Sequence, residues 1–356
     1  MAAVEDEIKS ITEDLVKFRT VDGNEGEFEK AFDYIKDYFS GTGLEISEYE
    51  FDGVKSLVVA DSENPEIMTH GHIDVVPADE EMFEPETSDG KMYGRGTADM
   101  KAGVAALMKL LKEKSDENTS LGLMITADEE KGGFKGAKKL AEEFNPEFFI
   151  SAEPNNTSGY LEIINKQKGV MKIDISAEGK NAHASRPWNG ENAAEKLWEK
   201  FSQFRKNFST RKEDWGTTLN LGNFKSEGPS NVVPDEAEAG LDIRWTEKYS
   251  PEMVKEDLKG IEGLNFTVNA EESMLNTDEE NRFVQKLKEA SEEVLDDKVP
   301  VTKKEPASDA RHFSDKGVPS VVFGPEGYNV HEDGEYAVVS SFGDYYRAVE
   351  NFVEKA

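Results

Sequence analysis

The chain has no cysteine, only five histidines, and far fewer basic than acidic residues, with 42 Lys and Arg against 74 Asp and Glu. The absence of cysteine excludes disulfides and thiolate metal sites, so any metal must be held by His, Asp and Glu. No stretch approaches the roughly 18–20 apolar residues that cross a bilayer. The opening residues, MAAVEDEIKSITEDLV, are acidic and amphipathic, unlike a signal peptide. We therefore expect a soluble, cytoplasmic protein with no membrane partner.

The formal net charge of −32 limits the partners of the chain. Nucleic acid is excluded as a partner, because binding a polyanion requires a basic footprint. Two interpretations of the acidity remain open. It is either an ordinary well-solvated surface or a halophilic adaptation to a salt-rich cytoplasm. In such a cytoplasm the Debye length falls to about 3 Å at 1 M, and carboxylates repel one another little.

Alternating helical and strand-like segments predict an α/β domain. Helices are expected at 4–18, 27–40 and 102–112, where apolar residues recur at helical spacing. The predicted strands are nearly continuous in apolar character, as in a sheet covered on both faces. They are Ser56–Ala60, Ile67–Thr69, Leu121–Thr126, Phe148–Ser151 and, near the end of the chain, Ser320–Phe323 between helices at 279–292 and 341–354.

A different pattern begins near residue 169, where KGVMKIDISAEGK alternates apolar and polar residues, as a strand with one wet face does. The order that follows is β-α-β-β-α-β, which predicts a ferredoxin-like module of about a hundred residues. At 356 residues the chain is long enough for two domains. We therefore expect residues 169–274 to be inserted into an α/β domain made of 1–168 and 275–356.

The first chemical motif is THGHIDVVP, in which His72 follows an apolar strand. Residues i and i+2 of an extended segment point the same way, so Asp74 can hold one ring nitrogen of His72 while the other binds a metal. A structural His–Asp pair in a turn would give the same pattern.

Acidic residues recur at two further places. Asp99 ends a glycine-rich loop before a helix, where it is either a helix-terminal charge or a bridge between two metals. Asp128, Glu129 and Glu130 follow a buried strand, where adjacent acids repel one another unless cations lie among them. Neighbouring Glu129 and Glu130 can face different ways, so one can be a base and the other a ligand. An ordinary acidic turn is the alternative.

Two more candidate ligands follow strands. Glu153 ends an apolar strand in SAEP, and His331 lies in the loop FGPEGYNVHEDGEY. The carboxyl edge of an open α/β sheet is where such folds place their sites. Taken together, the five candidates suit two zinc-like ions bridged by one carboxylate. They are His72, Asp99, Glu130, Glu153 and His331.

The order and spacing of these motifs resemble the M20 family of metallopeptidases and deacylases, from the helix before DGNE to the final HEDGEY. Its members include acetylornithine deacetylases, succinyl-diaminopimelate desuccinylases, aminoacylases and carboxypeptidases. The resemblance implies a zinc-exopeptidase-like catalytic domain with an inserted ferredoxin-like (βαββαβ) lid and dimerisation domain. It also implies two divalent ions, Zn²⁺ first, with Co²⁺ or Mn²⁺ as alternatives.

The resemblance assigns roles to the candidate residues. One metal would be held by His72 and Glu153 and the other by Glu130 and His331. Asp99 would bridge the two metals through a cis Asp99–Met100 peptide, and Asp74 would orient His72. Glu129 would be the general base.

The inserted module resembles the family's lid, and this implies further roles. His183, in GKNAHASRPWNGENA, would reach the site of the partner subunit in a homodimer and stabilise the oxyanion. Asn231 and Arg244, in SNVVPDEAEAGLDIR, would face the substrate, with Arg244 paired to its carboxylate. Arg311, in SDARHFSDKGVPSVVFGP, is a second and weaker candidate for substrate binding.

Three positions bear on the family assignment. Ala102 stands where the family often has glycine, and Gly334 stands where HxxNE would have asparagine. Both departures concern local loop shape. Glu153 in place of aspartate is a feature of the desuccinylase and carboxypeptidase branches.

The expected function is a metal-dependent hydrolase that cleaves the amide bond of an N-acyl amino acid or short peptide beside a free carboxylate. A deacylase of the acetylornithine or succinyl-diaminopimelate type is ranked above a dipeptidase or carboxypeptidase. Two other classes stay open at this point. One is a non-catalytic binding module on the same fold, and the other is an acidic Ca²⁺-binding protein, against which the two histidine ligands argue.

Overall fold

The computed structural model describes residues 2–154, 160–211 and 214–356. The chain divides into two compact units. Unit 1 comprises Met1–Gln167, Leu275–Lys304 and Ser308–Ala356, and unit 2 comprises Lys168–Met274 with Glu305–Ala307. Among the described residues, the helices are all too short or too polar to cross a membrane.

Unit 1 is built on a mixed sheet in the order β1-β2-β6-β3-β7-β17-β8-β15, with β16 also paired to β8. The central strands β6, β3, β7 and β17 run parallel, while the β1–β2 hairpin adds two antiparallel strands at one edge. The strands are β1 (Glu45–Phe51), β2 (Val54–Ala60), β3 (Ile67–His72), β6 (Leu121–Thr126), β7 (Phe148–Ser151), β8 (Ile163–Gln167), β15 (Leu275–Asn276), β16 (Val301–Lys304) and β17 (Ser320–Val322).

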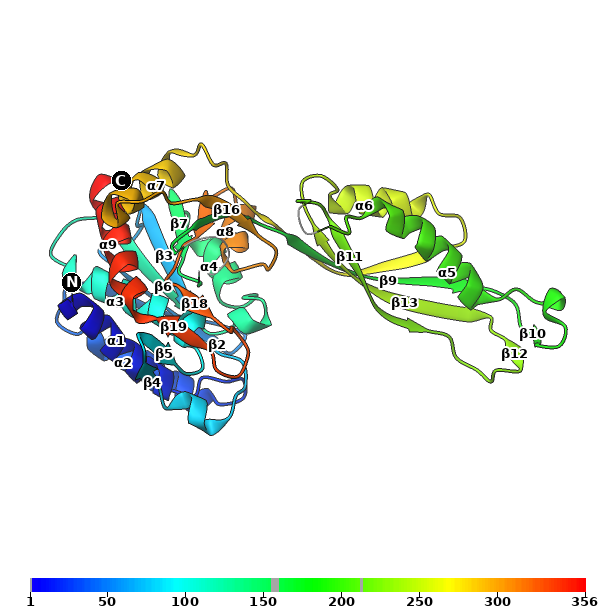
Figure 1. Ribbon diagram of the computed structural model, residues 1–356, viewed down its shortest axis with the longest axis horizontal. Helices are drawn as coiled ribbons and strands as arrows, with labels where there is room; N and C mark the ends of the chain where they lie inside the picture. Colours follow the sequence, from blue (N-terminus) through cyan, green and yellow to red (C-terminus); the bar gives the residue numbers. More distant parts are fainter. Residues whose placement is uncertain (1, 155–159, 212–213) are drawn as a thin grey trace. The chain divides into compact units, whose positions relative to one another are not determined.

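Helices cover both faces of this sheet, which explains the continuous apolar character of its central strands. Figure 1 shows the larger group on one side of unit 1 and the two short helices on the other. The larger group is α1 (Ala2–Lys17), α2 (Glu25–Tyr38), α3 (Ala102–Glu113), α7 (Arg282–Leu295) and α9 (Val339–Lys355), and the short helices are α4 (Ala137–Glu143) and α8 (Ala310–Asp315).

A second, small sheet of unit 1 has the order β18-β19-β5-β4. Its strands are β18 (Gly327–Tyr328), β19 (Tyr336–Val338), β5 (Lys91–Tyr93) and β4 (Glu86–Ser88). β19 pairs with β5 in antiparallel register, with Ala337 opposite Met92. This pairing brings a late loop of the chain against the glycine-rich loop that follows β5.

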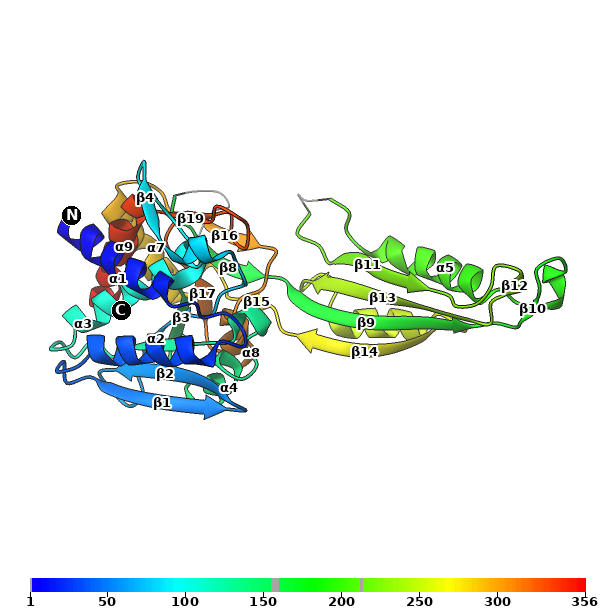
Figure 2. The ribbon, with the colours of Figure 1, turned by 90° about the horizontal axis from the view of Figure 1, so that it is seen from below.

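Unit 2 is a four-stranded antiparallel sheet in the order β11-β13-β9-β14, with two helices packed on one face (Figures 1 and 2). Its elements are β9 (Gly169–Glu178), α5 (Ala193–Phe204), β11 (Thr218–Lys225), β13 (Glu236–Trp245), α6 (Pro251–Lys259) and β14 (Asn265–Glu272), with the short pair β10 (Ala182–His183) and β12 (Val232–Val233). This is the predicted ferredoxin-like order of elements.

Alternation along β9 explains why unit 2 has only one covered face. Met171, Ile173 and Ile175 are buried against the helices, while Lys172 and Asp174 point to the open face. The prediction of a strand with one wet face is confirmed.

Several elements of unit 1 were not predicted. β1 is an edge strand with acids at Glu45, Glu48 and Glu50, which interrupt its apolar pattern. α4 and α8 have only seven and six residues, too few for helical periodicity to be recognised. α8 nevertheless packs firmly, since Phe313 stacks on Phe149 with ring centroids 3.9 Å apart.

Candidate metal centre

The candidate ligands follow the parallel strands of unit 1. His72 ends β3, Glu130 follows β6, and Glu153 follows β7. Because these strands run parallel, their carboxyl ends meet at one edge of the sheet. The loop between β18 and β19 brings His331 to the same edge. Asp99 lies in the turn Thr97–Lys101 before α3, and the Asp99–Met100 peptide bond is cis, as predicted.

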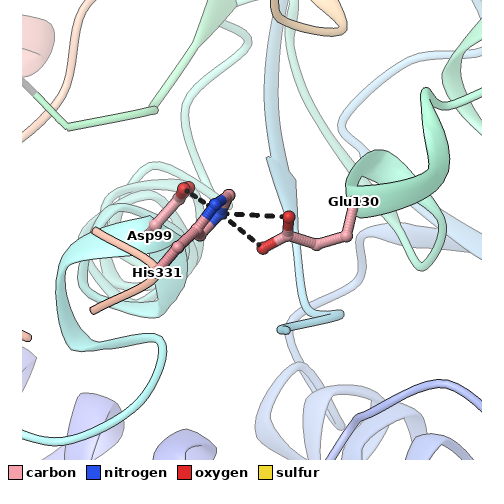
Figure 3. A group of neighbouring side chains, drawn as sticks. All are labelled: Asp99, Glu130 and His331. Atoms are coloured by element: carbon pink, nitrogen blue, oxygen red, sulfur yellow. Dashed lines mark hydrogen bonds and ion pairs between the residues drawn. The ribbon is translucent and has the colours of Figure 1, made fainter. Parts of the chain in front are cut away.

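The Asp99 carboxylate lies between two imidazoles. Its Oδ1 is 3.1 Å from His72 Nε2, and its Oδ2 is 3.5 Å from His331 Nε2. The same nitrogen of His331 is 3.1 Å from each carboxylate oxygen of Glu130. Figure 3 shows the His331 ring between the two acids. One oxygen facing each histidine is the disposition that a metal-bridging carboxylate requires.

The electrostatics of the histidines follow from these contacts. Hydrogen bonds to Asp99 and Glu130 raise the pKa of His331 to about 10. Burial lowers the pKa of His72, but Asp74 and Asp99 outweigh it and hold this pKa well above its usual value. Burial raises the pKa of Asp99, but the two histidines have the larger effect and hold this pKa well below its usual range. The charged form of each of these three groups is therefore stabilised by the opposite charge beside it.

Two further acids have pKa values shifted in the opposite direction. Burial, followed by the nearby Asp99, raises the pKa of Glu153 to about 8. Burial and then Glu153 raise the pKa of Glu129 well above its usual value. Glu153 Oε1 is also buried, and it has no hydrogen-bond partner among the described residues. Crowded acids of this kind are stabilised by cations among them, so the residues present fit divalent metal ions.

The Nδ1 atom of His72 faces both the main chain and the carboxylate of Asp74. His72 Nδ1 lies 2.9 Å from the main-chain carbonyl of Asp74 and 3.5 Å from its Oδ1. The other carboxylate oxygen of Asp74 accepts a hydrogen bond from the Glu130 amide at 2.9 Å. Asp74 therefore links the His72 strand end to the loop that carries Glu129 and Glu130.

Glu335 is a supporting residue that the sequence reasoning did not single out. Its Oε1 accepts hydrogen bonds from the amides of Gly96, Ala98 and Asp99, at 3.0, 3.0 and 3.1 Å. Its other oxygen is paired with Arg95 at 2.5 Å. The carboxylate thus fixes the turn that presents Asp99. The available signal was an acid four residues after His331, together with an arginine inside the glycine-rich loop.

His183 and Asn231 lie together in unit 2. The β10–β12 pair sets His183 opposite Val232, and the Ala184 amide donates to the Asn231 carbonyl at 2.9 Å. The His183 ring is exposed, and its Nδ1 accepts a hydrogen bond from the Ser185 amide at 3.1 Å. An amide can only donate, so in a neutral ring Nε2 carries the proton and is a donor.

Arg244 lines a cavity of about 380 Å³ in unit 2. Three other cations, Lys168, Arg205 and Arg211, line the same cavity, which is unusual in so acidic a chain. Arg244 itself is paired with Asp242 through Nε at 2.7 Å and Nη2 at 3.3 Å.

Arg311 lies in unit 1 and is 5% exposed. Its Nη1 donates to the Ser308 carbonyl and its Nη2 to the Gly132 carbonyl, both at 2.7 Å. These contacts direct the guanidinium to the backbone of the loop after β6.

A known protein family matches most of the chain. Residues 68–355 match the family model described as peptidase family M20/M25/M40. Among curated relatives, a probable succinyl-diaminopimelate desuccinylase of Staphylococcus aureus is 27% identical, covering 91% of this chain and 93% of the relative. A succinyl-diaminopimelate desuccinylase of Hydrogenovibrio crunogenus is also 27% identical, over 86% and 88%.

Solved structures agree on the fold. A tripeptidase from Staphylococcus aureus superposes with a TM-score of 0.78 at 23% identity, covering 99% of this chain and 98% of that one. An M20 family metallo-carboxypeptidase from Sulfolobus solfataricus gives 0.74 at 17% identity, covering 98% of each chain. The predicted catalytic fold with an inserted module is confirmed. The chain belongs to peptidase family M20/M25/M40 and is a metal-dependent hydrolase.

Proposed function

We propose that this hydrolase removes the acyl group from an N-acyl amino acid, cleaving an amide bond next to a free carboxylate. The observation that carries the proposal is the Asp99 carboxylate, set between His72 and His331 at the strand ends where Glu129 also lies. The two curated relatives named as desuccinylases support a deacylase.

Two divalent ions, preferably Zn²⁺, would be held by His72 with Glu153 and by Glu130 with His331, and Asp99 would bridge them. Such ions polarise the substrate carbonyl and lower the pKa of the attacking water. Among the described residues, the close cluster of Asp99, Glu130 and His331 supports this assignment.

Glu129 would move the proton. Its carboxylate accepts the proton of the attacking water and then delivers it to the nitrogen of the departing amine. In the protein alone, burial and the Glu153 charge favour the protonated form of Glu129. Divalent cations would lower the pKa of Glu129, so the ion content sets whether it can act as a base.

His183 would stabilise the oxyanion. Its Nε2–H is the free donor of the ring, because Nδ1 is taken by the Ser185 amide. The neighbouring Asn231 and the guanidinium of Arg244 would bind the substrate, with Arg244 taking the carboxylate. The basic cavity around Arg244 supports an anionic substrate end.

We also infer that the chain forms a homodimer through unit 2. β11 is an edge strand. Its Phe224 and the α5 residue Trp198 are 36% and 55% exposed, with their rings in edge contact. An unpaired edge next to exposed aromatics is a self-complementary surface of the kind that a two-fold dimer covers. In that dimer each His183 would serve the site of the other chain.

Peptidase activity is the second candidate, because the solved relatives include a tripeptidase and a carboxypeptidase. A substrate panel separates the two. Purified protein loaded with Zn²⁺ or Co²⁺ is assayed on acetylornithine, succinyl-diaminopimelate, dipeptides and tripeptides at low and high KCl. We expect the highest kcat/KM on a succinylated or acetylated amino acid. Faster cleavage of plain peptides would replace the deacylase assignment, and about two ions per chain by metal analysis would support the dinuclear site.

A further inference from the structure

A group of buried polar residues lies against the loop Asp128–Gly133, which follows β6 and carries Glu129 and Glu130. The group comes from the start of α8, and its members Asp309, Arg311 and His312 are 0%, 5% and 5% exposed. The metal centre makes no direct use of them. They contact the loop directly.

The Gly132 carbonyl receives two hydrogen bonds from this group. Arg311 Nη2 donates at 2.7 Å, and His312 Nε2 lies 2.9 Å away. A carbonyl can only accept, so His312 Nε2 carries a proton. Gly132 and the next residue, Gly133, have φ values of +97° and +63°, in the left-handed region. The carbonyl is thus held in the turn that re-aims the chain just after Glu130.

Asp309 packs against the next residue of the same turn. A Cβ on Gly133 would lie 1.9 Å from Asp309 Oδ1, so the carboxylate and the glycine backbone share one space. Asp309 is flanked by His70 Nε2 at 3.6 Å and His312 Nε2 at 3.7 Å. Its oxygens accept no hydrogen bond from the described residues. A buried acid without a hydrogen-bond donor is kept in place by the packing around it. Here the Asp309 carboxylate packs against Gly133 of the turn.

We propose that Arg311, His312 and Asp309 are positioning residues that clamp the turn Gly132–Gly133 and so aim Glu129 at the reacting atoms. This rests on the proposed function of Glu129 as the general base. Arg311 then acts through the loop, whereas a substrate-binding role would require a guanidinium that reaches a ligand. With 5% exposure and both terminal nitrogens on carbonyls, Arg311 is committed to the protein.

The clamp is separable from the fold. α8 is anchored by Phe313 and Ala310, which are fully buried, and by the stacking of Phe313 on Phe149. Removing the Arg311 guanidinium therefore leaves the helix in place and frees the carbonyls of Gly132 and, just before the helix, Ser308.

The test compares Arg311→Met with Arg282→Met, a matched change at an exposed arginine of α7. Zinc-loaded proteins are assayed for kcat and KM, and hydrogen exchange is followed in peptides covering residues 128–136. Loss of residues that orient an active-site group typically costs roughly 10–100-fold. We expect Arg311→Met to lose kcat in this range with KM little changed, and to exchange faster in the loop but not in β6. His312→Gln keeps a donor and retains kcat, whereas His312→Leu loses it.

A raised KM with an unchanged kcat would overturn the proposal in favour of substrate binding. Unchanged exchange in the loop would overturn it whatever the kinetics. If even the unmodified protein cleaves none of the amides, the proposed function fails, while exchange still decides whether the clamp exists.

A second test measures the effect of Asp309→Ala on kcat with and without Gly133→Ala, and we expect the two effects to have opposite signs. In the native protein, Asp309→Ala lowers kcat. In the Gly133→Ala variant, the new methyl group would clash with Asp309 Oδ1, so adding Asp309→Ala removes the clash and raises kcat above that of Gly133→Ala alone. Equal loss in both backgrounds would show that the Asp309–Gly133 contact does not position the loop.

Discussion

The two units hold their candidate functional residues in opposite surroundings. In unit 1, His72 has no exposed side-chain surface and Asp99 has 14%, and each is in contact with another candidate ligand. In unit 2, His183 and Asn231 are exposed, and Arg244 is paired with its neighbour Asp242. The first set is completed by the fold itself. In the function proposed above, the second set meets its targets in a substrate or a second chain.

The largest expected effect tests the self-contained unit. Glu129→Gln removes the proton acceptor and keeps the shape, so turnover falls by about 10²–10⁴ while both metals stay bound. The measurement is kcat on the preferred amide with metal analysis of the same sample, and Glu142→Gln on the surface is the control. Near-normal activity would refute Glu129 as the base.

The next effect tests whether unit 2 serves another chain. Removal of an oxyanion donor costs about 10²–10³, so His183→Ala alone is nearly inactive. Mixing His183→Ala with Glu129→Gln and allowing subunits to exchange gives heterodimers. One site of each heterodimer then has both Glu129 and His183 of the other chain, and activity returns. Proven exchange without recovery would mean that each chain works alone.

A smaller effect concerns Arg244. Charged hydrogen bonds contribute about 1.5–3 kcal/mol, so Arg244→Met raises KM by roughly 10–100-fold for a substrate with a free carboxylate. The same substrate with its carboxylate amidated shows little further loss with Arg244→Met. A similar loss on both substrates would remove Arg244 from carboxylate recognition.

The smallest effect bears on the surface of both units. If the net charge of −32 is a salt adaptation, KCl at 1–2 M screens carboxylate repulsion and raises the melting temperature. Each kcal/mol gained corresponds to roughly 2–4 °C for a domain of this size. An uncharged osmolyte at equal osmolality is the control. A flat or falling melting temperature with KCl would leave ordinary solubility as the reason for the acidity.

The residues that sequence could place are those fixed by periodicity and strand ends. β6 and β7 coincide with the predicted strands, and the acids after them lie at the sheet edge because parallel strands end together. The cis bond at Asp99 followed from family resemblance alone, since no local pattern signals it.

Other features depend on contacts that one segment cannot reveal. Glu335 is brought to the Asp99 turn by the pairing of β19 with β5, which the apolar periodicity of the sequence does not predict. The Asp74 carboxylate also reaches the Glu130 amide, a contact between the loops after β3 and β6 that the local i, i+2 rule cannot reveal. The Arg311 side chain is buried because its guanidinium donates a hydrogen bond to the carbonyl of Gly132, a residue far from it in the sequence.

The Glu335 contact has a consequence for synthesis. The amide of Asp99 is bonded to a carboxylate that lies 236 residues further along the chain. In a nascent chain the amides of the Asp99 turn are therefore left to water until the ribosome has made Glu335. His331 arrives in the same late loop. The candidate metal centre therefore forms only once both segments of unit 1 have met.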